Sequence, residues 1–291
     1  MAVSEQELTS LAATHDIISL GMLADDLRRQ RHALNTTFVR VADVAVDTGA
    51  PILISAGAGE VRIVGVPATR AAAVDRVRQV MAQAQGRVVS AFSLADLEVL
   101  AAGDGVTLRA LLEELHAAGL EMVAEAPFDR LQDPRRSVEE VNISGLALAR
   151  LTVHQSPSPD RLPLLKAVAD LQRAVAVIRA FAPLPRRTNS AAPSTGYDDV
   201  KHVALARVIV DNVPSIQVDW SLYGPKLAQV ALTVGADDVD AVSPEAETTE
   251  GRRRAPLEEI RRNIRAAGQE PVERNGRFEP MRRATSDVSS Q

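Results

Sequence analysis

Short apolar runs alternate with helix-like segments along most of this chain. The helical segments have clear ends, since Thr69 precedes one of them as an N-cap and Gly119 stops another. The strand-like runs occupy residues 37–46, 51–55, 60–66, 87–92, 120–126, 146–154, 174–181, 215–222 and 239–243. Strands that alternate with helices at this spacing form parallel β/α units, and about eight such units predict an α/β protein with a TIM-type (β/α) barrel.

The composition fits an α/β domain and excludes some classes of partner. Hydrophobic residues make up 46% of the chain but aromatic residues only 3%, so Ala, Val, Leu and Ile must fill the core. The net charge of −5 gives no electrostatic basis for binding nucleic acid. No apolar stretch approaches the roughly 20 residues of a membrane span, and the N-terminus lacks a secretory pattern. We expect a cytoplasmic protein.

The first crossover of the barrel looks incomplete. Only residues 56–59 separate the apolar runs 51–55 and 60–66, whereas a parallel crossover needs about a dozen residues and usually a helix. Four small residues form a hairpin or an irregular bend instead. The barrel is therefore expected to be incomplete or open near its first strand. The N-terminal helix, the C-terminal segment or a second subunit should then cover the exposed strand edge.

The chain also divides by composition. Residues 1–243 carry the barrel pattern. Residues 244–280 contain a polar loop and a short amphipathic helix, which we expect to pack on the barrel. Residues 281–291 are polar and are expected to form a disordered tail.

Two long segments resemble a known family. YGPKLAQVALTVGADDVD (residues 223–240) and PLEEIRRNIRAAGQEPVER (residues 256–274) are similar to the C-terminal region of radical S-adenosylmethionine (SAM) enzymes. The similar members are aminofutalosine synthase, dehypoxanthine futalosine cyclase and the deazaflavin (FO) synthases, which serve menaquinone and deazaflavin biosynthesis. The resemblance extends with gaps from about Leu20 to Pro280. It implies a TIM-type barrel, and it implies a CxxxCxxC loop that holds a four-iron cluster and SAM.

The chain departs from this family where the chemistry takes place. It contains no cysteine, and clusters of this kind require thiolate ligands. Gly65 and Val66 stand where the family has a double glycine. Where the family has a glycine-rich loop, this chain has AEAPFDRL (residues 124–131), which contains no glycine. We interpret the cluster and SAM sites as lost, expect no cofactor, and predict that SAM binds weakly or not at all.

Five residues are candidates for a ligand site, because sites in such barrels form at the C-terminal ends of strands. They are Glu125, His154, Arg186, Trp220 and Tyr223. Arg186, followed by Arg187, offers a planar fork for a carboxylate, and Trp220 or Tyr223 offers a face for a ring. An aromatic carboxylate or a quinone-pathway intermediate is therefore the ligand to test. The alternatives are a strand-end hydrogen bond for His154, a solvated loop for the arginines and core packing for the aromatic residues.

The acidic group near the last strand does not suggest a metal site. Asp237, Asp238 and Asp240 cannot all face one side of a strand, so capping and surface roles are preferred. The histidines are scattered and show no metal-ligand spacing.

Three functions remain open. The first is a catalytically inactive or cluster-independent relative of the menaquinone-pathway enzymes, which binds an intermediate or an active paralogue. The second is a metal-free enzyme that uses His154 and a carboxylate as acid and base. The third is a protein–protein scaffold, with a homo-oligomer as one form.

Overall fold

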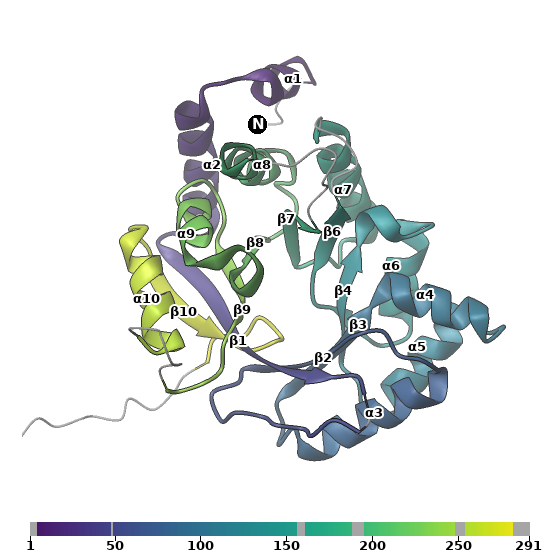
Figure 1. Ribbon diagram of the computed structural model, residues 1–291. Coiled ribbons are helices and arrows are strands. Elements are labelled where there is room, and N and C mark those ends of the chain that lie inside the picture. Colours follow the sequence, from purple (N-terminus) through teal and green to yellow (C-terminus); the bar gives the residue numbers. More distant parts are fainter. Residues whose placement is uncertain (1–4, 48, 156–160, 188–194, 248–253, 282–291) are drawn as a thin grey trace, which may run out of the picture.

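The protein is a closed barrel of parallel strands surrounded by helices (Figure 1). The computed structural model describes residues 5–47, 49–155, 161–187, 195–247 and 254–281. The strands that close the barrel are β1 (Asn35–Ala45), β2 (Glu60–Val64), β3 (Val88–Ser93), β4 (Met122–Pro127), β6 (Leu151–Gln155), β7 (Ala180–Arg187), β8 (Ser215–Asp219) and β9 (Asp238–Val242). The predicted TIM-type barrel is confirmed.

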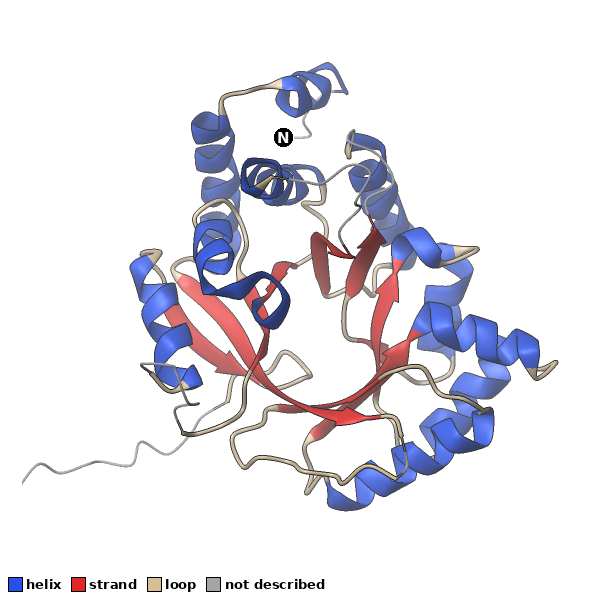
Figure 2. Ribbon diagram, viewed as in Figure 1, coloured by secondary structure: helices blue, strands red, loops and turns tan. Residues whose placement is uncertain are grey.

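The helices lie on the outside of the barrel (Figure 2). They are α1 (Glu5–Ala13), α2 (Ile17–His32), α3 (Arg70–Gln83), α4 (Leu94–Gly103), α5 (Leu108–Ala117), α6 (Pro134–Ile143), α7 (Leu162–Val175), α8 (Gly196–Ile209), α9 (Trp220–Leu232) and α10 (Pro256–Ala266). A 3-10 turn, η1 (Phe128–Arg130), and a short strand, β5 (Ala147–Leu148), complete the elements between β4 and β6. No helix among the described residues is long and apolar enough to cross a membrane.

The expectation of an open barrel is wrong. β1 pairs in parallel with β9, with Thr37 opposite Asp238 and Phe38 opposite Val239, so the first and last strands close the sheet. The error came from taking residues 51–55 as a strand. The first strand already ends at Ala45, and the connection to β2 is therefore longer than the four residues assumed.

The predicted absence of a helix between the first two strands is confirmed for the described residues. Residues 46–47 and 49–59 form turns and irregular structure, and Figure 2 shows loop on this side of the barrel. Ile52 and Ile54 pack against the core as a helix would. Arg76 of α3, only 1% exposed, donates hydrogen bonds to the backbone oxygens of Ala45 and Ala50. The loop thus covers the barrel wall and is held by a buried guanidinium group.

The C-terminal segment covers a strand edge next to this loop, although the barrel has no open seam between its first and last strands. β10 (Glu270–Arg274) pairs in parallel with Asn35–Val39 of β1. β9 occupies one edge of β1, so β10 uses the other edge, which β2 occupies from Val41 onward. Because β2 is short, β10 protects the part of the edge that β2 does not reach. Of the predicted tail at residues 281–291, Met281 donates its backbone N–H to the backbone oxygen of Glu273 at 2.8 Å, and residues 282–291 lie outside the described residues.

Some element boundaries differ from the sequence prediction. The N-terminal helix expected from the sequence is two helices, because the Asp16 side chain accepts a hydrogen bond from the backbone N–H of Ser19 and starts α2 anew. The expected strand at residues 174–181 begins only at Ala180. The preceding residues extend α7, which ends at the left-handed residue Ala176.

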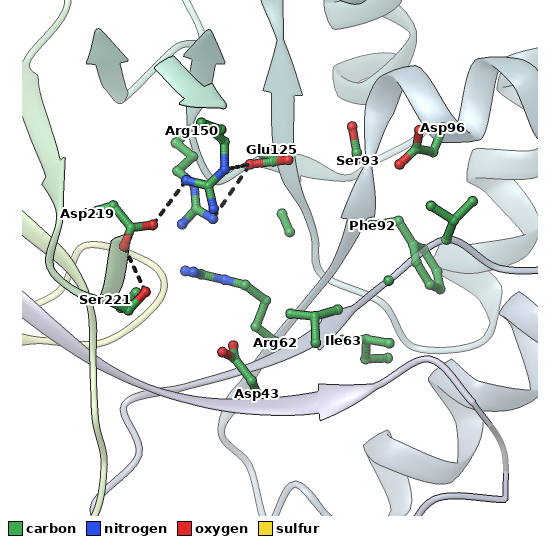
Figure 3. Close-up of a pocket in the computed structure, with 16 residues that line it drawn as sticks. Asp43, Arg62, Ile63, Phe92, Ser93, Asp96, Glu125, Arg150, Asp219 and Ser221 are labelled. Carbon is green, nitrogen blue, oxygen red and sulfur yellow. Dashed lines mark hydrogen bonds and ion pairs between the residues drawn. The ribbon is translucent and has the colours of Figure 1, made fainter. Parts of the chain in front are cut away.

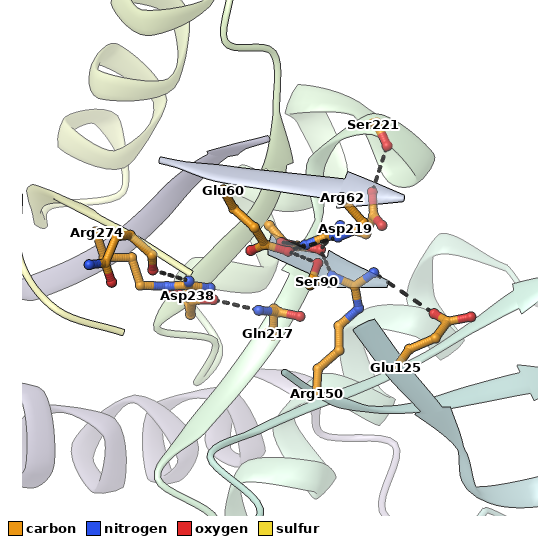
Figure 4. Close-up of polar contacts among 12 residues, drawn as sticks. Glu60, Arg62, Ser90, Glu125, Arg150, Gln217, Asp219, Ser221, Asp238 and Arg274 are labelled. Atoms are coloured by element: carbon orange, nitrogen blue, oxygen red, sulfur yellow. Dashed lines mark hydrogen bonds and ion pairs between the residues drawn. The ribbon is translucent and has the colours of Figure 1, made fainter. Parts of the chain in front are cut away.

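The interior of the barrel is unusually polar. The apolar core lies between the strands and the helices and includes Phe38, Val61 and Ile63. Among the described residues, a second and much smaller apolar cluster forms around Val88 and Met122. Bulky aliphatic side chains usually fill such a barrel. In this protein the inward positions hold buried polar and charged residues, namely Glu60, Arg62, Ser90, Arg150, Gln217, Asp238 and Arg274 (Figure 4). Asp240 is buried beside Arg62.

Candidate ligand site at the barrel mouth

A cavity of about 240 Å³ opens at the C-terminal ends of the strands (Figure 3). Its lining comes from seven of the eight barrel strands and the segments that follow them. The lining residues are Asp43, Arg62, Ile63, Val64, Gly65, Val66, Phe92, Ser93, Asp96, Ala124, Glu125, Arg150, Arg186, Asp219, Ser221 and Ala241. This is the end of the barrel at which TIM-type enzymes place their active sites.

Arg186 links two carboxylates across the cavity wall. Its Nε lies 3.1 Å from Oε2 of Glu125 and its Nη1 lies 3.0 Å from Oδ2 of Asp219. The other oxygen of Asp219 accepts hydrogen bonds from the Ser221 hydroxyl and the Leu222 backbone N–H, both at 2.9 Å. Asp219 thereby caps α9 and holds Arg186 at once. Burial alone would lower the pKa of Arg186, but the negative charges of Glu125 and Asp219 outweigh this effect and raise the pKa.

Two further arginines form the floor of the cavity around Asp240. Arg62 donates to both carboxylate oxygens of Asp240, at 3.0 and 2.9 Å, and to Oε1 of Glu60. Arg150 donates a hydrogen bond to Asp240 and lies 3.8 Å from Glu125. Burial alone would raise the pKa of Asp240, but Arg150 and Arg62 hold it well below its usual range. The floor is therefore a permanently charged, interlocked network.

Asp43 differs from the other carboxylates of the site. It projects from β1 into the cavity next to Arg62 (Figure 3), and among the described residues its carboxylate accepts no hydrogen bond. The residue as a whole is exposed. Neighbouring protein atoms nevertheless displace part of the water around the carboxylate, which raises the pKa of Asp43, and the favourable field of Arg62 does not fully compensate.

Three strand ends at the cavity have left-handed backbone. Gly65 after β2 has φ 111°, Phe92 in β3 has φ 62° and Ala241 in β9 has φ 56°. A side chain at Gly65 would meet Val46 at 2.8 Å. Positive φ costs free energy for Phe92 and Ala241, and such conformations concentrate at functional sites. Their presence on one cavity wall supports a functional reading of the mouth.

The structure brings together two of the five predicted site residues. Glu125 and Arg186 line the cavity, whereas His154, Trp220 and Tyr223 do not. The backbone N–H of His154 donates to Asp129 at 2.6 Å, and Trp220 is buried in the core. The Tyr223 hydroxyl donates to the backbone oxygen of Pro185, and burial raises the pKa of this phenol. A ligand-binding role for these three residues remains a prediction, at positions outside this cavity.

Sequence reasoning missed the charged residues inside the strands. Each of the missed residues lies before a strand end or between apolar neighbours, so the sequence offered no reason to select it. They are Asp43, Arg62, Arg150 and Asp219. The preference for surface roles near the last strand is wrong, since Asp237, Asp238 and Asp240 are 2%, 0% and 1% exposed. Asp238 and Asp240 are two residues apart and both face inward. Arg274 meets Asp238, with each of two guanidinium nitrogens 2.7 Å from a carboxylate oxygen. The two-residue spacing of Asp238 and Asp240, which places both on one face of a strand, could have indicated this from the sequence.

The residues present do not fit an iron–sulfur cluster. The β1–β2 connection, where the resemblance places the cysteine loop, has no thiolate, and its Ser55 hydroxyl is hydrogen-bonded to the backbone oxygen of Pro244. Among the described residues there is also no group of three or more His, Asp or Glu side chains that converge as metal ligands. The donor chemistry that a cluster of this kind requires is missing from the chain.

Comparison with known proteins agrees with the resemblance seen in the sequence. Residues 182–287 match the family described as the CofH/MqnC C-terminal region. The match covers about a third of the chain. Cyclic dehypoxanthine futalosine synthase from Streptomyces coelicolor is 26% identical over 67% of this chain and 55% of its own length. Aminodeoxyfutalosine synthase from Thermus thermophilus is 27% identical over 72% of this chain and 64% of its own length.

A second group of similar proteins carries a different name. The 5-amino-6-(D-ribitylamino)uracil–L-tyrosine 4-hydroxyphenyl transferase from Archaeoglobus fulgidus is 27% identical over 64% of this chain and 63% of its own length. The chain thus spans roughly half to two thirds of these three curated relatives.

Solved structures confirm the fold over almost the whole chain. Methylornithine synthase (PylB) aligns with a TM-score of 0.66 over 94% of this chain and 95% of its own, at 11% identity. The hydrogenase maturase HydG from Carboxydothermus hydrogenoformans aligns with a TM-score of 0.64 over 94% of this chain and 76% of its own, also at 11% identity. At this identity the likeness concerns the barrel alone.

Proposed function

We propose that this protein is a cluster-independent relative of the menaquinone-pathway enzymes that binds a small polar intermediate at the barrel mouth without radical chemistry. The observation that carries the proposal is the cavity itself. Ion pairs from several strands position Arg186, Glu125 and Asp219 around an open space, while the chain lacks the thiolates for a cluster. Fixing charged side chains in this way is a property of binding sites.

The lining suggests a ligand with a ring and several polar groups. Val64 and Val66 are 38% and 66% exposed and offer an apolar wall. On the neighbouring strand β3, the buried hydroxyl of Ser93 has no hydrogen-bond partner among the described residues. A polar ligand would satisfy such groups, which are costly when left alone. The relatives are named for futalosines and for a ribitylaminouracil, and a molecule of that general kind fits both walls.

An aromatic carboxylate is the weaker form of the same proposal. Arg186, whose guanidinium group was expected to bind the carboxylate, already forms ion pairs with Glu125 and Asp219. A ligand carboxylate would have to displace one of these two acids. The expectation of a carboxylate therefore remains a prediction to be tested beside the polar-ring ligand.

The test is a ligand screen with matched variants. Futalosine-type nucleosides, ribitylaminouracil and simple aromatic carboxylates are added to the purified chain, and calorimetry measures their binding. We expect a nucleoside-like or ribityl ligand to bind, and Arg186→Ala to weaken that binding by about 1–3 kcal/mol, the range for charged hydrogen bonds. Arg187→Ala is the control, because the neighbouring Arg187 does not line the cavity. Absence of binding by every compound would reject the proposal.

The two other hypotheses have less support at this site. His154 does not line the cavity, which weakens its assignment as an acid or base there. The protein–protein scaffold remains a prediction, and it becomes the better explanation if the ligand screen is negative. Weak or absent SAM binding also remains a prediction, which the same calorimeter can check.

A further inference from the structure

The carboxylates outnumber the cations around the cavity. Three guanidinium groups, from Arg62, Arg150 and Arg186, face the space or form its floor. Five carboxylates lie beside them, from Asp43, Glu60, Glu125, Asp219 and Asp240. Asp96 also lines the cavity, but Arg130 neutralises it at 3.1 Å. The mouth therefore attracts positive rather than negative charge.

Among the described residues, Asp43 is an acid of the cavity that forms neither a hydrogen bond nor an ion pair with an arginine. Arg62, the arginine whose charge acts most strongly on Asp43, uses Nε and Nη2 for Glu60 and Nη1 and Nη2 for Asp240. Glu60 gains a further hydrogen bond from the Ser90 hydroxyl at 2.6 Å. Asp43 thus lies in the electrostatic field of Arg62 but accepts no hydrogen bond from its guanidinium group. The carboxylate is exposed in the cavity and is therefore available to a cationic or hydrogen-bond-donating group of a ligand.

We propose that the ligand of the barrel mouth carries a protonated amine that pairs with Asp43. This inference rests on the proposed function and names the chemistry of one end of the ligand. An ammonium group supplies the missing charge and donates hydrogen bonds to Asp43 while the arginine network stays intact. The raised pKa of Asp43 agrees with this reading, because a bound cation would restore the carboxylate form.

A metal ion is a poorer match for the same charge. Divalent cations take six or more oxygen ligands that converge on one point. Among the described residues no cluster of three acidic or histidine side chains is arranged in that way. The carboxylates near Asp43 are instead held apart by the guanidinium groups between them.

Three probes with the same ring and different end groups test the proposal: benzylamine, benzyl alcohol and benzoate. Binding is measured by NMR through the methyl signals of Val64 and Val66, which report on the mouth itself. We expect benzylamine to bind about tenfold more tightly than benzyl alcohol, which corresponds to about 1.4 kcal/mol, and benzoate to bind most weakly. The preference for the amine should fade as the pH falls through the pKa of Asp43.

Variants of two aspartates separate charge from structure. Asp43→Asn should remove the preference for the amine and leave binding of the alcohol within about twofold, whereas Asp43→Glu should keep most of the preference. Asp47→Asn is the matched control, because Asp47 follows the same strand but does not line the cavity. Magnesium chloride, added alone, should leave the two methyl signals unchanged.

The outcomes distinguish this inference from the proposed function. Equal affinity for amine and alcohol, tightest binding of benzoate, or an unchanged amine preference in Asp43→Asn would overturn the amine assignment while the mouth remains a ligand site. A shift with magnesium that Asp43→Asn abolishes would replace the amine by a metal ion. If no probe moves the methyl signals and the nucleoside screen is negative as well, both proposals fail.

Discussion

Arg62 on β2 and Asp240 on β9 form a two-pronged ion pair across β1, the strand between them. The two nitrogen–oxygen distances are 3.0 and 2.9 Å, and both side chains are almost completely buried. Arg150 donates to the same carboxylate from β6's side of the barrel. One aspartate thus pairs with two interior arginines, and it does so at the point where the first and last strands close the barrel.

Replacing this aspartate should be costly. We expect Asp240→Asn to lower the free energy of unfolding by about 3–5 kcal/mol, because it leaves two buried guanidinium groups without their shared counter-charge. Urea denaturation measures the change. Asp170→Asn is the control, since Asp170 pairs with Arg173 on the surface, where both side chains are 65% exposed, and should change stability by less than about 0.5 kcal/mol. Equal effects of the two substitutions would contradict the closing role of Asp240.

The connection between β1 and β2 should depend on Arg76. Arg76→Ala removes two hydrogen bonds to the loop backbone, at 2.8 and 3.2 Å, and leaves the oxygens of Ala45 and Ala50 without this donor. We expect a loss of about 2 kcal/mol and faster proteolysis near the exposed Leu53. Arg78→Ala changes the same helix at a side chain that is 64% exposed. If both variants are cleaved at the wild-type rate, Arg76 does not hold the loop.

Stability should fall on mild acidification because of His202. Burial, which removes water from the imidazole, and the positive charge of Arg161 lower the pKa of His202 to about 3, against an ordinary value near 6.5. The unfolded chain therefore takes up a proton first, so this contribution to stability is complete above pH 6.5 and is lost as the pH falls from 6.5 towards 3. The expected slope is about 1.4 kcal/mol per pH unit.

The slope is measured by urea titration between about pH 6.5 and 5, above the range where most carboxylates protonate. His202→Gln should flatten it, whereas His15→Gln, at an exposed position, should not. A slope that survives His202→Gln would assign the acid sensitivity to another group.

Iron and sulfide should find no site in this chain. Anaerobic reconstitution is expected to leave the absorbance at about 400 nm unchanged, because the chain offers no thiolate. Iron analysis after gel filtration provides an independent reading. A stoichiometric cluster would mean that oxygen and nitrogen ligands replace thiolates in this protein.

Local patterns predicted most of the fold. Thr69 caps α3 as expected, and the periodic segments became helices, because their caps and apolar spacing act over a few residues. α6 was missed although Asp133 and Pro134 mark its start, and β10 was missed because its pairing with β1 is not a local property. Barrel closure was mispredicted for the same reason, since it depends on hydrogen bonds between distant strands.

The site was predicted only in part. Glu125 and Arg186 were found because they stand near strand ends, a position that the sequence reveals. Arg62 and Arg150 lie among apolar neighbours, and their inward direction depends on strand register. Asp43 was hidden by the uncertain end of the first strand. A side chain's role at a barrel mouth therefore follows from register more than from residue type.

The pairing of β1 has a consequence for synthesis of the protein on the ribosome. Thr37 pairs with Asp238, which lies 201 residues later in the chain. One edge of β1 therefore stays unpaired until those 201 residues have been synthesised. At about 5–20 residues per second, that delay is on the order of 10–40 seconds. During this time an apolar, β-branched strand is made without its final neighbour, and shielding of that nascent edge, for example by a chaperone, would limit misassembly between growing chains.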